Sequence, residues 1–225
     1  YFYRRLDMQE GFFYQRRLLY VLWLICIVVG CVIMLTTDKG YEIQYLNQFY
    51  NDVTIPLFTF FTRLGEWIGI VIPFLYFLFF KPLKYQLGFV FVALATLVLV
   101  YFFKHIVYPD AIRPIVFFEQ QLIDIVNRPE IPLNRKHTFP SGHTTAGFAY
   151  FFYAALCADK KKFRLFFFGI AFLVGFSRIF LVQHFVSDVV AGSVLGVTIA
   201  TLSYYFVIYK NAFKSPRLNK NLFDV

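Results

Sequence analysis

Long apolar runs separated by short polar segments are the main pattern of the sequence. A helix needs about 20 residues to cross a bilayer core of ~30 Å. Six runs approach or exceed this length, and they cover residues 18–35, 58–80, 85–103, 144–158, 163–181 and 186–209. Since backbone groups inside lipid must satisfy their own hydrogen bonds, every run is expected to be helical. The pattern predicts an all-α protein with one membrane-embedded domain over residues 1–225, a bundle of six transmembrane helices.

Parts of the chain depart from this simple pattern. The second run carries Arg63 and Glu66 in its first turns, and these side chains are expected at the outer interface or paired with each other. The fourth run is short, and its helix is expected to begin at or just before Ser141. Residues 36–54 predict an amphipathic piece on the membrane surface. Residues 117–126 predict a short helix inside a proline-rich outer segment.

The composition excludes a water-soluble domain. Hydrophobic residues make up 59% of the chain and charged residues only 16%, whereas a soluble domain carries about 25% charged residues. The three cysteines, Cys26, Cys31 and Cys157, all lie inside apolar runs. An odd number of cysteines in such positions does not describe a disulfide framework.

The basic residues predict the orientation of the bundle. The formal net charge of +9 is compatible with a nucleic acid, a membrane surface or an acidic substrate as partner. Most of the 22 Lys and Arg residues lie between the apolar runs, where they act as topology signals. If the N-terminus is cytoplasmic, the inside segments hold 14 of them and the outside segments hold eight. Both termini are therefore predicted to be cytoplasmic, and no nucleic-acid partner is expected.

Three clusters of chemically active residues lie near the ends of the predicted helices. They are Lys104 with Arg113-Pro114, Pro140-Ser141-Gly142-His143, and Ser177-Arg178 with His184 and Asp188. The third and fifth runs end on the outer side, and the fourth and sixth begin there. Topology therefore predicts that all three clusters share the outer face of the membrane.

The cations and small residues of these clusters suit a phosphate group. A phosphate carries two negative charges and several acceptor oxygens. Arg113 and Arg178 offer fork-like donors, and Lys104 offers a point charge. Ser141 and Gly142 stand at an expected helix N-terminus, where free N–H groups and the helix dipole attract anions. We therefore expect these five residues to bind phosphate.

The two histidines of the clusters suit phosphate transfer. His143 is placed to protonate a leaving oxygen. His184 and Asp188 are four residues apart, so in the first turn of a helix they share one face. Asp188 then accepts a hydrogen bond from one ring nitrogen of His184 and leaves the other nitrogen as a nucleophile.

On these residues the chain resembles the type 2 phosphatidic acid phosphatase superfamily. The P-S-G-H motif of the family matches Pro140–His143, and S-R-x5-H-x3-D matches Ser177–Asp188. The family's first motif is usually K-x6-R-P, whereas the spacing from Lys104 to Arg113 is K-x8-R-P. This departure affects how Lys104 reaches the phosphate. The resemblance extends from about Tyr85 to Tyr209.

The resemblance implies a two-step reaction that needs no metal and no other cofactor. His184 attacks phosphorus and forms a phosphohistidine, and His143 protonates the departing group. Water then hydrolyses the intermediate. The relatives include bacterial phosphatidylglycerophosphate, undecaprenyl pyrophosphate and lipid A phosphatases, and also glucose-6-phosphatase and the vanadium haloperoxidases. A phosphorylated membrane lipid is therefore the expected partner, in the bacterial inner membrane with the site facing the periplasm. The oligomeric state stays open.

Two other functions compete with a lipid phosphatase. The substrate could be a water-soluble phosphate ester, or the protein could bind or transport phospholipid without catalysis. A haloperoxidase is disfavoured because those relatives resemble soluble helical proteins. His105 and His137 match no motif and are expected to be loop or surface residues. Arg128, Arg135 and Lys136 either draw an anionic head group to the site or meet acidic lipid and solvent.

Overall fold

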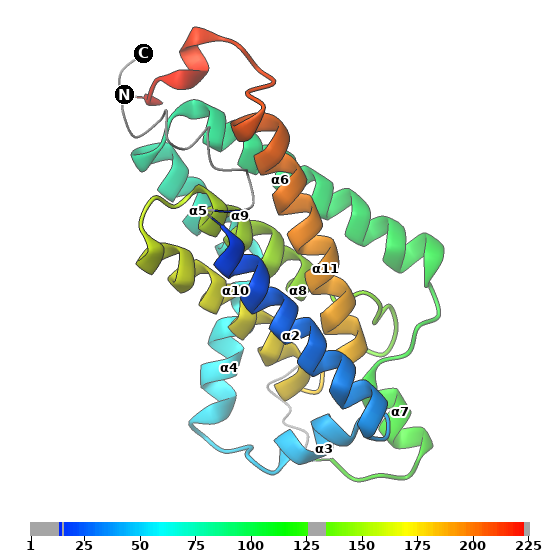
Figure 1. Cartoon of the computed structure of the whole chain (residues 1–225). Coiled ribbons are helices and arrows are strands. Elements are labelled where there is room, and N and C mark those ends of the chain that lie inside the picture. The colour runs from blue at the N-terminus through cyan, green and yellow to red at the C-terminus, as the bar shows by residue number, and fades with distance from the viewer. Residues whose placement is uncertain (1–13, 15, 126–133, 223–225) are drawn as a thin grey trace.

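The structure, a computed structural model, describes residues 14, 16–125 and 134–222, and in this part every regular element is helical (Figure 1). The α-helices are α2 (Arg17–Thr36), α3 (Tyr41–Asn47), α4 (Thr54–Arg63), α5 (Trp67–Phe80), α6 (Leu83–Phe102), α7 (Pro114–Gln120), α8 (Gly142–Gly147), α9 (Tyr153–Cys157), α10 (Lys161–Phe180) and α11 (Val186–Ser203). Wider π-helical turns, η1 (Phe103–Val107), η2 (Phe148–Phe152) and η3 (Tyr204–Tyr209), extend or join these helices, and a 3₁₀ turn η4 (Pro216–Asn219) follows.

Most of the predicted spans have counterparts among these helices. Four stretches in the described part are long and apolar enough to cross a membrane, namely Arg17–Thr36, Leu83–Val107, Lys161–Phe180 and Val186–Tyr209. Helices α4 and α5 satisfy the same requirement together, but they are bent by 58° at the break between them. They make a fifth span if the bent pair is counted as one.

The remaining predicted span, residues 144–158, lies at the centre of the bundle. It consists of α8, η2 and α9 in direct succession, and this stretch is shorter than the spans around it. Phe151, Phe152 and Leu156 are all 0% exposed, because α5, α6, α10 and α11 pack around them. The stretch is apolar because it forms the core of the bundle, and its role as a sixth membrane crossing stays a prediction.

Glycines allow α11 to pack closely on this central helix. A Cβ atom on Gly196 would stand 2.5 Å from the carbonyl oxygen of Thr145, and one on Gly192 would stand 2.7 Å from the carbonyl oxygen of Ser141. Both distances are well inside van der Waals contact, so a side chain at either position would force the two backbones apart. The small residues therefore hold the start of α11 against the start of α8.

The connecting segments fold partly as expected. Helix α3 confirms an amphipathic helix within residues 36–54, with Ile43 buried and Tyr45 exposed. The helix expected at residues 117–126 is shifted toward the N-terminus. Helix α7 begins at Pro114, which suits the first position of a helix because its ring fixes φ and no donor is lost. Residue 126 itself lies outside the described residues.

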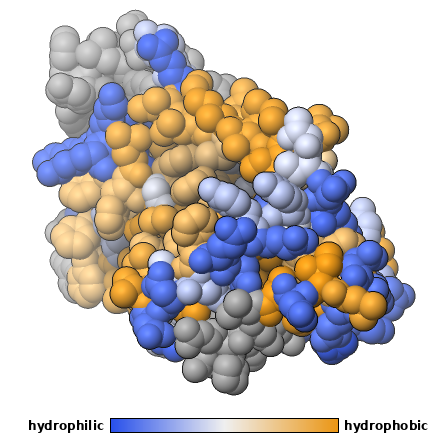
Figure 2. Space-filling view, turned by 90° about the horizontal axis from the view of Figure 1, so that it is seen from below, coloured by the Kyte–Doolittle hydropathy of each residue, from blue (hydrophilic) through white to orange (hydrophobic). Residues whose placement is uncertain are grey.

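The two ends of the bundle differ in their polar contacts. At one end, Arg16 Nε donates to the carbonyl of Leu156 at 2.9 Å, and Lys81 pairs with Asp159 at 2.7 Å. Helices α3 and α7 lie at the other end, together with the start of α11 (Figure 1). Seen from that second end, hydrophilic side chains gather over the middle and one side of the face, next to an apolar sector (Figure 2). This second end carries the candidate site.

The packing of α11 makes a prediction about stability. We expect Gly196→Ala to lower the thermal unfolding midpoint in detergent micelles, because overpacking of this kind costs about 1–3 kcal/mol. Gly169→Ala in α10 is the matched control, since a Cβ there meets no atom within 4 Å. Tryptophan fluorescence during heating measures both variants. Equal midpoints for the two variants would show that the close contact does not support the fold.

Candidate active site

The start of the central helix brings the three predicted clusters together. Ser141 is the N-cap of α8, and its hydroxyl accepts hydrogen bonds from the N–H of Thr144 at 3.4 Å and from the hydroxyl of Thr144 at 2.8 Å. The N–H of Ser141 donates to the carbonyl of Asp188 at 3.0 Å, which links the second cluster to the third. A Cβ on Gly142 would stand 3.5 Å from Cε of Lys104, so the first cluster is adjacent as well.

His184 is held by two polar neighbours on one side of its ring. It lies between α10 and α11 and is 0% exposed. Its Nδ1 is 3.2 Å from Asp188 Oδ2 and 3.1 Å from the hydroxyl oxygen of Thr138. Asp188 Oδ2 also accepts from the Thr138 hydroxyl at 2.5 Å and from the N–H of Phe185 at 3.1 Å. Since an ionised carboxylate only accepts hydrogen bonds, the ring proton belongs on Nδ1, and the lone pair of Nε2 is free to attack.

Two buried arginines lie beside this imidazole, and Gln183 holds both. Gln183 Oε1 accepts from Arg113 Nη1 and from Arg178 Nη2, each at 3.2 Å. Arg113 Nη1 is also 3.4 Å from Nε2 of His184, and Arg178 Nη1 donates to the hydroxyl of Thr62 in α4. Arg178 Nε is buried and has no hydrogen-bond partner among the described residues. Because buried donors are normally paired, this N–H is suited to an incoming anion.

Lys104 reaches the site despite its unusual spacing. It lies in the π-helical turn η1, and its Nζ donates to the carbonyl of His137 at 2.8 Å. His137 Nδ1 in turn donates to the carbonyl of Lys104 at 3.0 Å, and the exposed ring of His105 lies 4.5 Å from the ring of His137. The two histidines are loop and surface residues, as expected. The K-x8-R-P segment is two residues longer than the usual K-x6-R-P, and Lys104 nevertheless lies beside Gly142.

His143 has a partner that the sequence interpretation missed. Its Nε2 is 3.0 Å from Oε1 of Glu66, at the break between α4 and α5. Glu66 therefore pairs with His143. The reason is the bend of 58°, which turns the start of α5 toward the central helix. Of the two expectations for Arg63 and Glu66, no direct ion pair between them is present among the described residues, and a position at the outer interface stays a prediction.

The electrostatics of the two imidazoles follow from burial and nearby cations. Burial, reinforced by the charges of Arg113 and Arg178, lowers the pKa of His184 well below its ordinary value. A base with a lowered pKa is neutral at every pH above that value, so His184 is neutral at physiological pH, as a nucleophile requires. Burial and then Arg178 lower the pKa of His143 to about 4, and Glu66 opposes them.

The structure thus gathers all eight predicted site residues at one end of the bundle and adds four more. The added residues are Thr62, Glu66, Thr138 and Gln183. Thr138 and Gln183 lie next to the motifs in the sequence, and this position could have marked them as site residues. Glu66 is a charge inside an apolar run, which is itself a functional signal. Thr62 gave no signal, because a threonine is common in such helices.

Two basic residues of the loop that precedes α8 form ion pairs. Arg135 bonds to Glu119 at 2.5 Å, and Lys136 lies 3.5 Å from Asp110, all on exposed surface. Exposed ion pairs of this kind are worth little, and these cations remain accessible to an acidic head group. Arg128, and Arg4 and Arg5 among the basic residues counted in the orientation, lie outside the described residues.

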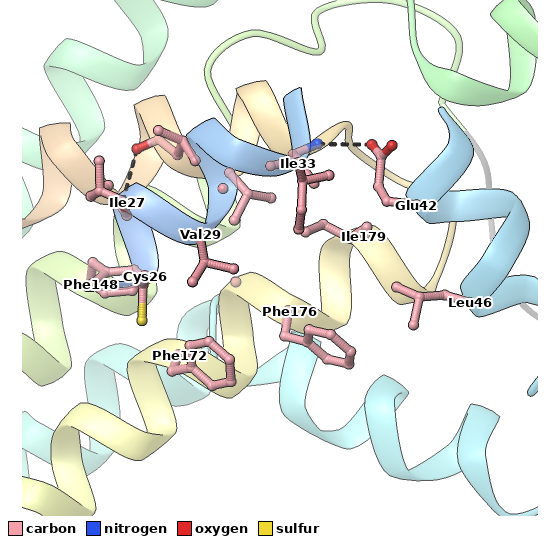
Figure 3. A pocket seen from close by; sticks show the side chains of 16 residues that line it. Cys26, Ile27, Val29, Ile33, Glu42, Leu46, Phe148, Phe172, Phe176 and Ile179 are labelled. Atoms are coloured by element: carbon pink, nitrogen blue, oxygen red, sulfur yellow. Dashed lines mark hydrogen bonds between the residues drawn. The ribbon is translucent and has the colours of Figure 1, made fainter. Parts of the chain in front are cut away.

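A separate apolar hollow lies between α2, α3, α10 and α11 (Figure 3). Val29 of α2 faces Phe172 and Phe176 of α10 across it, and Glu42 at its edge accepts from the N–H of Val186 at 3.3 Å. None of the predicted site residues lines this hollow. The cation cluster and the hollow are therefore distinct features of the bundle.

The membrane-length helices make this chain an integral membrane protein, and its cation-lined imidazoles are those of an enzyme that acts on phosphate esters. Residues 85–212 match the profile of the PAP2 superfamily, and this match covers more than half of the chain. The chain belongs to the PAP2 superfamily, and it is a phosphatase. A search of curated proteins gave no match.

Two crystal structures share the fold. One is LpxE from Aquifex aeolicus, with a TM-score of 0.60 and 24% identity over 72% of this chain and 91% of that one. The other is described as the first transmembrane PAP2-type phosphatidylglycerolphosphate phosphatase, from Bacillus subtilis. It has a TM-score of 0.58 and 20% identity over 88% of this chain and 97% of that one. At this identity the similarity establishes the fold alone.

The contact between Thr138 and Asp188 gives a prediction about catalysis. We expect Thr138→Val to lower kcat by about tenfold or more, because a hydrogen bond to a charged group is worth about 1.5–3 kcal/mol. Thr138→Ser keeps the hydroxyl and should retain most of the activity. Release of inorganic phosphate by the purified variants measures the effect. If Thr138→Val and Thr138→Ser were equally active, the hydroxyl would have no part in orienting Asp188.

Proposed function

We propose that the protein is a metal-independent lipid phosphatase that hydrolyses a phosphate or pyrophosphate monoester through a phosphohistidine. The observation that carries this proposal is the buried Nε of Arg178, a donor without a partner among the described residues, in a cluster with Arg113 and Lys104. A phosphate supplies acceptor oxygens for such a cluster, and His184 lies within it.

The geometry supports a definite role for each group. Nε2 of His184 attacks phosphorus while Asp188 holds the Nδ1 proton. Arg113, Arg178 and Lys104 neutralise the charge on the equatorial oxygens. His143 protonates the departing oxygen, and water then releases phosphate from His184. Ser141 caps the helix whose first N–H groups, beginning at Gly142, face the phosphate.

A membrane lipid is the substrate that best fits this location. The site lies at one end of a bundle whose outer surface is apolar, with Leu97 at 68% and Val28 at 54% exposed. A head group can therefore enter from the level of the lipid head groups. Phosphatidylglycerophosphate, undecaprenyl pyrophosphate and lipid A are all compatible with the short outer loops. A water-soluble ester is the competing substrate class, and a direct comparison of turnover separates the two.

We further infer that the site faces the outside, which in a bacterium is the periplasmic side of the inner membrane, and that both termini are cytoplasmic. Support comes from Lys81, Lys84 and the run Lys160–Lys162, which lie at the helix ends opposite the site. The positive-inside rule assigns that end to the cytoplasm.

The nucleophile is tested by His184→Ala. We expect this variant to lose turnover by at least ~10³-fold and to form no labelled phosphoenzyme in alkaline-quench experiments with lipid phosphate radiolabelled on phosphorus, because covalent catalysis has no other nucleophile here. His105→Ala, an exposed histidine at the same end, is the control and should behave like the parent chain. Chelator should change neither protein. Full turnover by His184→Ala would refute the mechanism.

The orientation is tested by labelling single introduced cysteines in intact cells. Lys136→Cys, in the exposed loop beside the site, should react with a membrane-impermeant maleimide. Lys162→Cys, at the start of α10, should react only after the cells are opened. The parent chain gives the background, since its own cysteines lie in apolar helices. The opposite labelling pattern would place the site in the cytoplasm.

A further inference from the structure

Glu66 occupies a position that its local helix does not explain. It is the N-cap residue of α5, yet its carboxylate makes no capping hydrogen bond to that helix. The carboxylate instead contacts Nε2 of His143 at 3.0 Å, with the two side chains 43% and 30% exposed. A Cβ on the preceding Gly65 would stand 2.9 Å from Cβ of His143, so the glycine lets the break between α4 and α5 approach this histidine.

The chemistry of this contact determines which nitrogen is free. An ionised carboxylate accepts hydrogen bonds but cannot donate, so Nε2 of His143 carries a proton. Nδ1 of His143 has no hydrogen-bond partner in the part of the chain that the structure describes. We propose that Glu66 is a positioning residue that anchors Nε2 of His143 and leaves Nδ1 to deliver the proton to the leaving oxygen. This proposal rests on the proposed role of His143 as the acid.

The charges around His143 give Glu66 a second task. Arg178 from α10 and Lys104 from η1 both disfavour a protonated imidazole, and so does burial. Glu66 is the neighbour that favours it, and Arg63, one turn earlier, acts on Glu66 itself. Removing the negative charge of Glu66 therefore lowers the pKa of His143. A lower pKa means that His143 loses its acid form at a lower pH. The pH dependence of the reaction should therefore shift toward lower pH.

The proton balance of the first step is simple. The bond from His184 Nε2 to phosphorus forms as the bond from phosphorus to the leaving oxygen breaks. The proton on Nδ1 of His143 moves to that oxygen. The resulting neutral His143 keeps the proton on Nε2, which still donates a hydrogen bond to Glu66. In the second step the water oxygen bonds to phosphorus as the bond from phosphorus to His184 Nε2 breaks, and Nδ1 of His143 takes the proton from that water, which restores the acid. Glu66 stays ionised throughout.

The test compares Glu66→Gln with the parent chain on two kinds of substrate. The first substrate is a lipid phosphate monoester, whose alkoxide leaving group needs a proton. At pH values above the pKa of His143, kcat for this substrate should fall about tenfold for each unit by which that pKa drops. The basic limb of the pH profile should move to lower pH, with KM changed less than about twofold. With p-nitrophenyl phosphate the loss should be small, because p-nitrophenolate departs without a proton.

A double variant and a control make the result decisive. Because Glu66 acts through His143, the double variant His143→Ala with Glu66→Gln should match His143→Ala alone on p-nitrophenyl phosphate. Asp159→Asn removes an exposed carboxylate at the opposite end and should leave the pH profile unchanged. A superimposable profile for Glu66→Gln, or a further loss in the double variant, would overturn the proposal. Turnover by His184→Ala would instead contradict the phosphohistidine mechanism, so the two failures are distinguishable.

Discussion

Burial of two guanidinium groups beside a neutral imidazole is the constraint on which this site depends. Arg113 and Arg178 are only 6% and 5% exposed, and a charge removed from water is costly unless the protein supplies acceptors. The fold supplies some of them through Gln183, which bonds to both arginines. It supplies none within the described residues for Arg178 Nε. Under the proposed function, a phosphate dianion would provide the missing acceptor, so the affinity for phosphate and the cost of holding the cations together would have the same origin.

The close packing of the helix ends is what makes this arrangement possible. Gly192 lets α11 approach the carbonyl of Ser141, and the N–H of Ser141 bonds to the carbonyl of Asp188. This contact fixes the start of α11 against α8, the helix that Ser141 caps. Any gap here would admit water, and water would weaken the effect of the cations on His184 because charge interactions are screened in a high dielectric. The packing of the core and the electrostatics of the site are therefore coupled.

The sequence could predict what depends on local pattern, and the rest depends on contacts between distant segments. Apolar runs predicted α2, α6, α10 and α11, since hydropathy reports the lipid environment directly. The motif spacing predicted which residues meet, because helix ends on one face must converge. Hydropathy is the same for a straight helix and for one bent by 58°, so the break at Glu66 was not predictable. Without that break, its contact with His143 could not be foreseen either.

Each of the two imidazoles has its own carboxylate, Asp188 for His184 and Glu66 for His143, and both pairs lie near the same cations. The two carboxylates explain how the two rings can hold different protonation states. The cations disfavour a charged ring at both His184 and His143. This field suits His184 in its proposed role as nucleophile, which requires a neutral ring, and it opposes His143 in its proposed role as acid, which requires a charged ring. Asp188 is 2% exposed and orients a ring that stays neutral, whereas the side chain of Glu66 is 43% exposed and favours the charged form. A bound phosphate would cancel much of the cation field, so His143 gains its proton most readily when the substrate is in place.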